Sequence, residues 1–145
     1  MAVFSKGDRV EVCSKEEGFL GSYYEATVVS PLHNNTLYKV QYKNLVEEED
    51  QTRPLVEIVS ADEVRPMPPR PTTPKEATRT FRYLERVDAF DNDGWWVGTI
   101  TGKQGSKYWV YFETSNDEIA YPVSQLRNHL EWCNGKWVSC TKSLV

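Results

Sequence analysis

The chain has few of the residue types on which catalytic and metal sites usually depend. Its 145 residues include only two histidines and three cysteines. Neither histidine belongs to a nucleophile–base motif, and there is no glycine-rich phosphate loop, Cys-x-x-Cys pair or His-Glu-x-x-His run. These absences predict that the protein is not an enzyme and uses no cofactor.

The cysteines also give no disulfide framework. Their number is odd, which favours a reducing compartment; they are Cys13, Cys133 and Cys140. Together with His129 they could in principle supply metal ligands, but the spacing matches no common zinc pattern. Because buried free cysteines are ordinary core residues, we expect no metal site.

Long apolar runs are absent as well. No segment is long and apolar enough for a membrane span or a secretory signal peptide. The composition, 39% hydrophobic and 26% charged, is instead typical of a globular protein. We therefore expect an intracellular protein, or a piece of one, that has no membrane partner.

What the chain does contain is an internal repeat. Each half has an Arg-Val-acid strand, then paired aromatics opening a β-branched strand, then an aromatic-rich strand. These segments span residues 9–11, 21–29 and 38–42, and again 86–88, 94–100 and 108–112. Such a repeat predicts the architecture directly. We expect an all-β protein built from two small, strongly bent antiparallel sheets, best described as barrels because a barrel hides its sheet edges.

A proline-rich segment separates the two copies. Five of the ten residues at 65–74 are proline, which predicts a stiff, extended linker. We expect one domain at 1–66, a proline-rich and basic linker at 67–80, and a second domain at 81–145. A domain of this size is marginal alone, so we expect the two barrels to pack side by side.

The net charge of −4 is shared unevenly between the copies. Residues 1–66 hold 12 acidic and 7 basic side chains, whereas residues 67–145 hold 9 and 10. The acidic excess comes chiefly from the run Glu47 to Asp50. A negative first copy would attract a cationic partner and repel a phosphate backbone. Taken alone, the run is equally compatible with a solvated loop that keeps the protein soluble.

The aromatic residues of the first copy suggest a binding site. A methylated lysine is bulky and weakly hydrated, and it is held by several aromatic faces at once. Four candidates for such a cage are Phe19, in a loop, Tyr23 and Tyr24, which open a strand, and Tyr42, which ends one. Consecutive strand residues point to opposite faces, so we favour Tyr24 over Tyr23. The competing interpretation is that these rings fill a small core.

Acidic residues follow the last of these aromatics directly. We expect Glu47, Glu48 and Asp50 to border the same barrel mouth and to orient a basic peptide. The second copy has aromatics at corresponding places in less acidic surroundings, and a second cage there is left open: Trp95, Trp96, Tyr111 and Phe112. The remaining tryptophans are expected to be packing residues: Trp109, Trp132 and Trp137.

The ordered set of segments resembles the plant tandem Agenet domain, a Tudor-like branch of the Royal family. The resemblance covers nearly the whole chain, through residues 4–12, 17–29, 38–42 and 64–66 and, in the partner repeat, 130–137. It implies two five-stranded Tudor-like barrels packed side by side. It also implies a nuclear chromatin reader that binds methylated lysine on a histone tail. In the heterochromatin readers of this family, the implied ligand is a dimethylated lysine of the histone H3 tail.

The resemblance also assigns the cage. Carried over position by position, its two tyrosines fall on Tyr24 and Tyr42, with Phe19 as a third wall from the longer Agenet loop. Many repeats of this family have Trp where this chain has Tyr23.

Two other functions stay open at this stage. One is a nucleic-acid-binding module that uses exposed tryptophans and a local basic strip of Arg79, Arg82 and Arg86. The net negative charge argues against it. The other is an adaptor that docks a protein partner without reading any modification.

Overall fold

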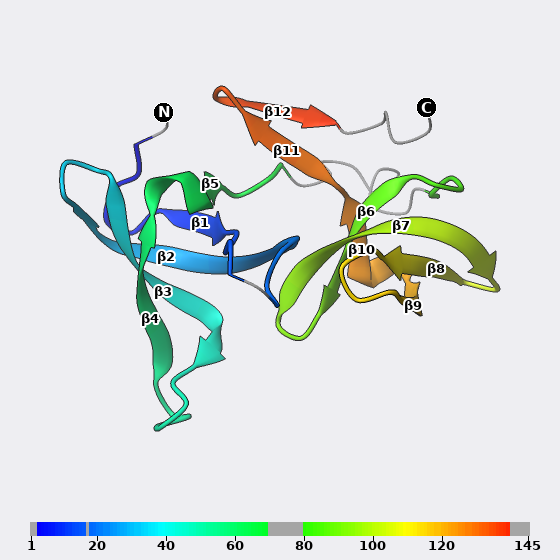
Figure 1. The fold of residues 1–145 in the computed structure, drawn as a ribbon, viewed down its shortest axis with the longest axis horizontal. Coiled ribbons are helices and arrows are strands. Elements are labelled where there is room, and N and C mark those ends of the chain that lie inside the picture. Colours follow the sequence, from blue (N-terminus) through cyan, green and yellow to red (C-terminus); the bar gives the residue numbers. More distant parts are fainter. Residues whose placement is uncertain (1–2, 17, 70–79, 140–145) are drawn as a thin grey trace. The chain divides into compact units, whose positions relative to one another are not determined.

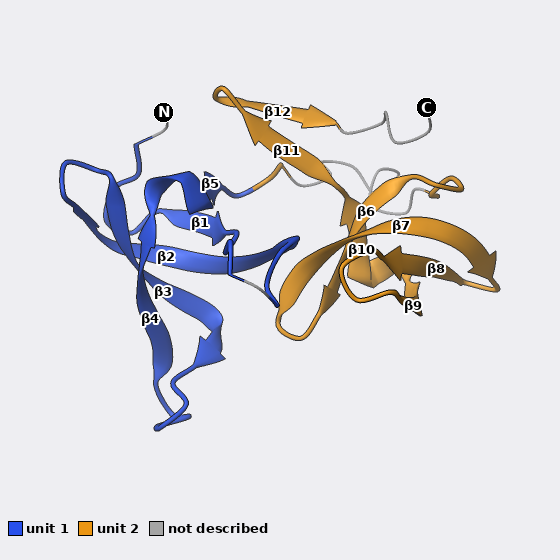
Figure 2. Cartoon of the chain, in the orientation of Figure 1, with its two compact units in different colours: residues 1–67 blue, residues 68–145 orange. Residues whose placement is uncertain are grey.

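The computed structural model describes residues 3–16, 18–69 and 80–139 (Figure 1). These residues form twelve β-strands and two short 3₁₀ turns, which confirms the predicted all-β class. The chain divides into two compact units, Met1–Met67 and Pro68–Val145 (Figure 2). Most of the predicted linker at 67–80 lies outside the described residues. No helix in the described part of the chain is long and apolar enough to cross a membrane.

Unit 1 is a five-stranded antiparallel sheet in the order β5-β1-β2-β3-β4. Its strands are β1 (Arg9–Val12), β2 (Ser22–Leu32), β3 (Leu37–Val46), β4 (Pro54–Ser60) and β5 (Val64–Pro66). The 3₁₀ turn η1 (Ala61–Glu63) carries the chain from β4 to β5. Strand β3 alternates buried Tyr38, Val40 and Tyr42 with exposed residues, as expected for a sheet with one face on the core.

Unit 2 repeats this order as β10-β6-β7-β8-β9. Its strands are β6 (Arg86–Asp91), β7 (Gly94–Gln104), β8 (Lys107–Phe112), β9 (Asp117–Pro122) and β10 (Leu126–Asn128), with η2 (Val123–Gln125) before β10. The two five-stranded repeats predicted from the sequence are therefore present.

A separate hairpin follows the second sheet. It consists of β11 (Leu130–Cys133) and β12 (Lys136–Ser139), and its turn is formed by Asn134 and Gly135 with φ of 51° and 76°. Positive φ at both positions is what an Asn-Gly hairpin turn requires. Trp132 and Trp137 are cross-strand partners whose ring centroids lie 5.0 Å apart, so both act as packing residues here.

The repeat extends to individual core contacts. In unit 1 the Phe4 N–H donates to the Tyr38 hydroxyl at 3.2 Å, and the two rings meet edge to face at 5.7 Å. In unit 2 Phe81 and Tyr108 make the same pair, with distances of 3.3 Å and 5.4 Å. Each pair therefore holds the segment that precedes the first strand against the third strand of its sheet.

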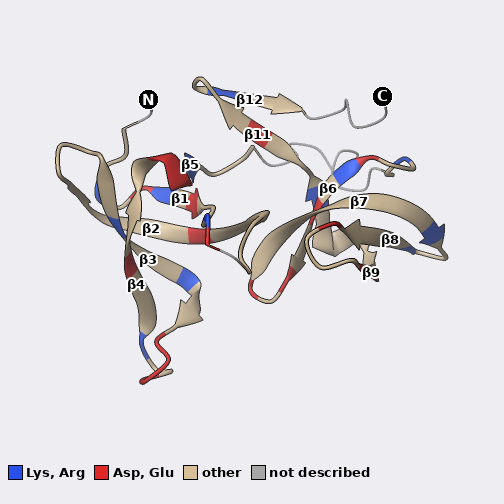
Figure 3. Ribbon diagram, in the orientation of Figure 1, with Lys and Arg blue, Asp and Glu red and all other residues tan. Residues whose placement is uncertain are grey.

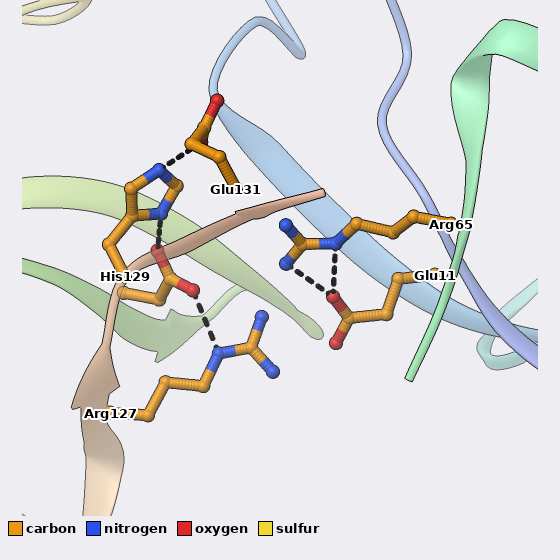
Figure 4. Close-up of polar contacts among 6 residues, drawn as sticks. Glu11, Arg65, Arg127, His129 and Glu131 are labelled. Atoms are coloured by element: carbon orange, nitrogen blue, oxygen red, sulfur yellow. Dashed lines mark hydrogen bonds and ion pairs between the residues drawn. The ribbon is translucent and has the colours of Figure 1, made fainter. Parts of the chain in front are cut away.

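A second repeated feature is an acid–arginine pair whose arginine lies against an aromatic ring. Glu11 accepts from Arg65 at 2.7 Å (Figure 4). The Arg65 guanidinium lies 3.6 Å from the centre of the Tyr23 ring. In unit 2 Asp88 accepts from Arg127 at 2.8 Å, and Arg127 lies 4.2 Å from the centre of Trp95. In both units the pair joins the first strand to the last at directly opposed positions.

Candidate functional site

Three aromatic rings of unit 1 form a cluster in which Tyr24 meets both Phe19 and Tyr42 edge to face. The centroids of Phe19 and Tyr24 lie 6.2 Å apart at 68°, and those of Tyr24 and Tyr42 lie 6.5 Å apart at 90°. Edge-to-face contact at this spacing is the favoured geometry for aromatic pairs. The structure thus brings together three of the four predicted cage residues.

Sheet register explains why the two tyrosines meet. Tyr42 on β3 is paired with Ala26 on β2, two residues beyond Tyr24. Residues two apart on a strand share a face, so Tyr24 and Tyr42 are diagonal neighbours on the inner face of the sheet.

Phe19 reaches the cluster from the loop between β1 and β2. Its carbonyl accepts the Ser22 hydroxyl at 2.6 Å and the Ser22 N–H at 3.2 Å. Gly18 and Gly21 flank this turn with φ of 91° and 77°, a region that favours glycine. This turn carries the Phe19 ring to the side of Tyr24.

The three rings differ in exposure. Tyr24 is 7% exposed and Tyr42 5%, whereas Phe19 is 43% exposed. The tyrosines therefore form the floor of the cluster and Phe19 its rim.

Tyr23 lies on the other side of β2. The Arg65 guanidinium covers its ring at 3.6 Å, and Tyr23 is only 9% exposed. The alternation of strand residues thus gives the two consecutive tyrosines different environments, and the structure does not bring Tyr23 to the ring cluster.

A carboxylate that sequence reasoning missed lies beside Tyr42. The Tyr42 hydroxyl donates to Oε1 of Glu57 on β4 at 2.9 Å. Burial, this hydrogen bond and the negative charges of Glu57, Glu63 and Glu16 together raise the pKa of Tyr42 well above its usual range. Glu63 is itself fixed, because one oxygen accepts the Ser60 N–H at 3.0 Å and the other the Lys15 N–H at 3.3 Å.

The acids predicted to border the cage occupy the tip of the β3–β4 hairpin (Figure 3). Glu47 follows the Val46–Pro54 pair that closes the hairpin, and its N–H bonds to the Arg53 carbonyl. Asp50 accepts from the Thr52 hydroxyl and N–H, which hold the pKa of its carboxyl below the usual value, and it pairs with Arg53 at 3.5 Å. Glu48 is exposed in the same loop.

The four aromatic residues considered for a second cage lie in two different environments, as Tyr23 and Tyr24 do in unit 1. Trp95 lies over Arg127, and the Tyr111 hydroxyl donates to Asn116 in the following turn at 2.7 Å. Trp96 and Phe112 instead belong with the core of unit 2.

The described residues include no group of three or more His, Cys, Asp or Glu side chains that could hold a metal ion. Cys13 and Cys133 are free thiols, and Cys140 lies outside the described residues. His129 is buried, with Nδ1 2.7 Å from Asp88 and Nε2 bonded to Glu131 (Figure 4).

The proposed basic strip is only partly described. Arg79 lies outside the described residues, and Arg82 is exposed. Arg86 is half-buried in β6, and its Nε is enclosed without a hydrogen-bond partner. The described residues therefore do not present a row of exposed arginines here.

Unit 1 also has an open surface cavity of about 520 Å³. Its lining is mainly polar: Arg9, Glu25, Thr27, Gln41, Tyr42, Lys43 and Pro54. Arg9 and Lys43 share the Glu25 carboxylate, at 2.5 Å and 3.8 Å, so the lining carries two positive side chains and one negative side chain.

Comparison with known proteins gives a consistent assignment. The model of the Agenet domain matches residues 7–69 and 84–131. The chain is 36% identical over 136 residues to Protein AGENET DOMAIN (AGD)-CONTAINING P1 of Arabidopsis thaliana, covering 90% of this chain and 26% of that protein. It is also 36% identical over 132 residues to DUF724 domain-containing protein 3 of the same plant, covering 89% and 19%. The chain therefore spans about a quarter or less of these relatives.

Two solved structures share the fold over almost the whole chain. One is the crystal structure of Arabidopsis thaliana AGDP1 AGD34, with 34% identity, a TM-score of 0.86, and 95% of this chain and 90% of that chain covered. The other is the ADCP1 tandem Agenet domain 3-4, with 31% identity, a TM-score of 0.82, and 96% and 89% covered.

Proposed function

The chain belongs to the Agenet domain family and carries two of its repeats, and from this premise we propose that it is a non-catalytic chromatin reader that binds methylated lysine. The observation that carries the proposal is the edge-to-face cluster of Phe19, Tyr24 and Tyr42, in which the Tyr42 hydroxyl is hydrogen-bonded to the Glu57 carboxylate. We propose the tail of histone H3 as the partner, with the dimethylated lysine of heterochromatin as the mark and the nucleus as the compartment.

The rings supply the attraction for the cation. Each aromatic face that contacts an alkylated ammonium contributes on the order of 0.5–2 kcal/mol, more where water is excluded. Because Tyr24 and Tyr42 are nearly buried, the ligand meets them away from water, while exposed Phe19 closes over it. Unmodified lysine is more strongly hydrated and loses more on entering such a site.

Glu57 supplies the preference for the methylation state. A mono- or dimethylated ammonium retains an N–H that can donate to a carboxylate, whereas a trimethylated one does not. The hydrogen bond from Tyr42 holds the Glu57 carboxylate beside the rings before any ligand arrives. This arrangement favours dimethyllysine over trimethyllysine.

Titration calorimetry with un-, mono-, di- and trimethylated H3 peptides tests the proposal. We expect micromolar binding that appears on methylation and is tightest for the dimethylated peptide. Phe19→Ala should weaken it about tenfold or more with the fold intact, since this ring is 43% exposed. Tyr83→Ala is the matched control, because Tyr83 is 68% exposed and belongs to unit 2.

Two results would overturn the proposal. One is equal affinity for unmodified and methylated peptides, which would make the protein an adaptor that reads no modification. The other is unchanged affinity in a folded Phe19→Ala variant, which would leave these rings as core and rim packing.

A further inference from the structure

We propose that the outer edge of β4 in unit 1 binds an extended basic peptide as an added strand, through main-chain hydrogen bonds to Val56 and Ile58. This deepens the proposed function and rests on it for the identity of the peptide, which is the tail that carries the methylated lysine. The ring cluster holds one side chain of that tail, and β4 holds its main chain.

Strand β4 lies at the edge of the five-stranded sheet. Within the described residues it pairs with β3 alone, whereas β1, β2 and β3 each have a neighbouring strand on both sides. Figure 1 shows the β3–β4 hairpin extending beyond the other strands of unit 1. An edge strand presents a row of N–H and C=O groups that can pair with another chain.

The hydrogen bonds to β3 determine the direction of each backbone group in β4. The Ala61 N–H donates to the Thr36 carbonyl at 2.9 Å, and the register continues from this pair without a shift as far as Gln41–Val56. In an antiparallel ladder the hydrogen-bonded pairs recur at every second residue. Counting back from Ala61, the odd-numbered residues of β4 therefore turn their N–H and C=O groups toward β3, and the even-numbered residues turn them away.

Val56 and Ile58 are the even-numbered residues in the middle of the strand. Ser60, the next one, agrees with this direction, because its N–H donates to Glu63 Oε1 at 3.0 Å and not to β3. Pro54, at the other end, has no backbone N–H to donate. The open stretch is thus bounded on both sides, and its donors are the N–H groups of Val56 and Ile58.

This stretch lacks the usual protection of an edge strand. Natural sheet edges are commonly blunted by lysine, by proline or by a bulge. Between Pro54 and Ser60 the strand reads Leu-Val-Glu-Ile-Val, and the side chains of Val56 and Ile58 are 40% and 60% exposed. β-Branched residues favour the extended conformation that pairing requires. The edge is therefore suited to receive another strand.

The charges around the edge favour a basic occupant. Glu57 lies between the two open residues with its side chain exposed, and β4 has no basic side chain. Glu47 and Glu48 lie in the loop at the tip of the same hairpin. A second copy of this chain, paired through the same edge, would bring two Glu57 side chains together, and opposed like charges destabilise a strand pair. A basic peptide supplies the opposite charge instead.

Strand addition also brings a lysine to the ring cluster. A peptide residue opposite Glu57 has its side chain on the same face of the sheet, with the two Cβ atoms about 4.5–5.5 Å apart. The Tyr42 hydroxyl donates to Glu57 Oε1 on that face at 2.9 Å. A methylated lysine at this position of the tail therefore has its ammonium beside the Glu57 carboxylate and next to the Tyr42 ring.

Amide hydrogen exchange of the full chain, followed by NMR, tests the proposal with dimethylated and unmodified H3 peptides as probes. In the free protein, the amides of Val56 and Ile58 should exchange rapidly, whereas β3 protects those of Glu57 and Val59. Saturating dimethylated peptide should slow exchange at Val56 and Ile58 by at least about tenfold, because each N–H becomes hydrogen-bonded.

Ile58→Pro provides a matched test by mutation. It removes a donor at the edge without removing a hydrogen bond to β3, and proline is tolerated where the N–H of an edge strand faces solvent. Ile58→Val keeps the N–H and a branched side chain. The Ile58→Val variant should bind dimethylated peptide about three- to tenfold more tightly than Ile58→Pro, the range expected for one main-chain hydrogen bond.

A second measurement needs no protein variant. In a series of dimethylated peptides that each carry one N-methylated backbone amide, only every second substitution should weaken binding, because alternate amides of an added strand face β4. Equal losses at neighbouring positions would overturn the proposal.

The outcomes separate this proposal from the proposed function. Methylation-dependent binding that leaves exchange at Val56 and Ile58 unchanged would overturn strand addition and leave the reader function standing. Equal protection by both peptides would support the added strand and contradict the reading of methylation. If neither peptide bound, both proposals would fall.

Discussion

Tyr42 serves two purposes at once, because its ring forms the floor of the cluster and its hydroxyl holds Glu57 at 2.9 Å. A phenylalanine at position 42 would keep the aromatic ring in the cluster but would lose the hydrogen bond to the Glu57 carboxylate. The neighbouring Tyr23 shows the opposite arrangement, since its ring is committed to Arg65. At the scale of single residues, the site is therefore specified by what each hydroxyl and ring face already contacts.

Tyr42 also gives the protein a dependence on high pH. An unfolded tyrosine ionises near pH 10, whereas burial and Glu57 raise the pKa of folded Tyr42 above that. The folded state therefore binds more protons than the unfolded state above about pH 10. As a result, this contribution to the free energy of unfolding is complete below pH 10 and is lost as the pH rises.

Above pH 10, the free energy of unfolding should fall less steeply with pH in the Tyr42→Phe variant than in the wild type. The difference in slope is at most about 1.4 kcal/mol per pH unit. Urea unfolding between pH 9 and 11 measures it, with exposed Tyr83→Phe as the control. Tyr121 contributes in the same direction, so a residual slope is expected. Parallel curves for the wild type and the Tyr42→Phe variant would contradict the prediction.

At the scale of elements, one close approach between strands shapes unit 2. A Cβ added to Gly98 on β7 would lie 2.4 Å from Val110 Cγ1, 3.0 Å from the Tyr111 carbonyl oxygen and 3.1 Å from Phe112 Cδ1. Unit 1 has Ala26 at the equivalent position. The absent side chain lets β8 and the Phe112 ring close against β7.

Gly98→Ala should therefore destabilise the protein by about 1–3 kcal/mol, the usual cost of overpacking a core. Gly102→Ala on the same strand is the matched control, since its nearest contact would be Trp109 Cδ1 at 3.6 Å, an ordinary separation. Denaturant midpoints of the two variants make the comparison. Equal midpoints would show that β8 moves aside freely.

The buried pair Glu11–Arg65 joins the first and last strands of unit 1, and both side chains are almost wholly enclosed. Arg65→Met should cost about 3–5 kcal/mol, because it leaves a buried carboxylate without this cation. Adding Glu11→Leu should restore much of the stability. The exposed pair Arg9–Glu25 is the comparison, and Arg9→Met should cost less than about 1 kcal/mol. A double variant as unstable as Arg65→Met would contradict this account.

The sequence predicted the elements well because their signals are local. The paired aromatics and the Arg-Val-acid strands each depend on neighbouring residues, and period-two alternation separated Tyr23 from Tyr24. The Glu57 contact was missed because it depends on the β3–β4 register, in which Glu57 is the partner of Val40, two residues before Tyr42. This register makes Glu57 a diagonal neighbour of Tyr42, and it cannot be read from the residue pattern of either strand alone. The contacts of Tyr121 with Phe112 and Asp91 were missed for the same reason, because they depend on how β9 pairs with β8.

At the scale of the whole molecule, acidic side chains of unit 1 lie at two places, and we expect them to affect peptide binding differently. The hairpin loop carries Glu47 and Glu48 at its tip, while Glu57 lies beside the rings. Exposed charges of one sign raise the rate at which a basic tail arrives, and salt screens them. A fixed carboxylate at the cation distinguishes one methylation state from another. Under the proposed function, the first kind of charge would set the affinity for any basic peptide, and the second would set the selectivity for methylation state.

The joint variant Glu47→Gln/Glu48→Gln should therefore weaken binding of the unmodified and dimethylated peptides by the same factor and reduce the dependence of affinity on salt. Glu57→Gln should instead lower the ratio between dimethylated and trimethylated peptides, with little change in salt dependence. Calorimetry at about 50 and 300 mM salt separates the two effects. Asp50 is left unchanged in this test, because its bonds to Thr52 shape the loop. If the loop variant changed the methylation preference, the loop itself would have to reach the bound lysine, and Glu57 would lose its assigned role.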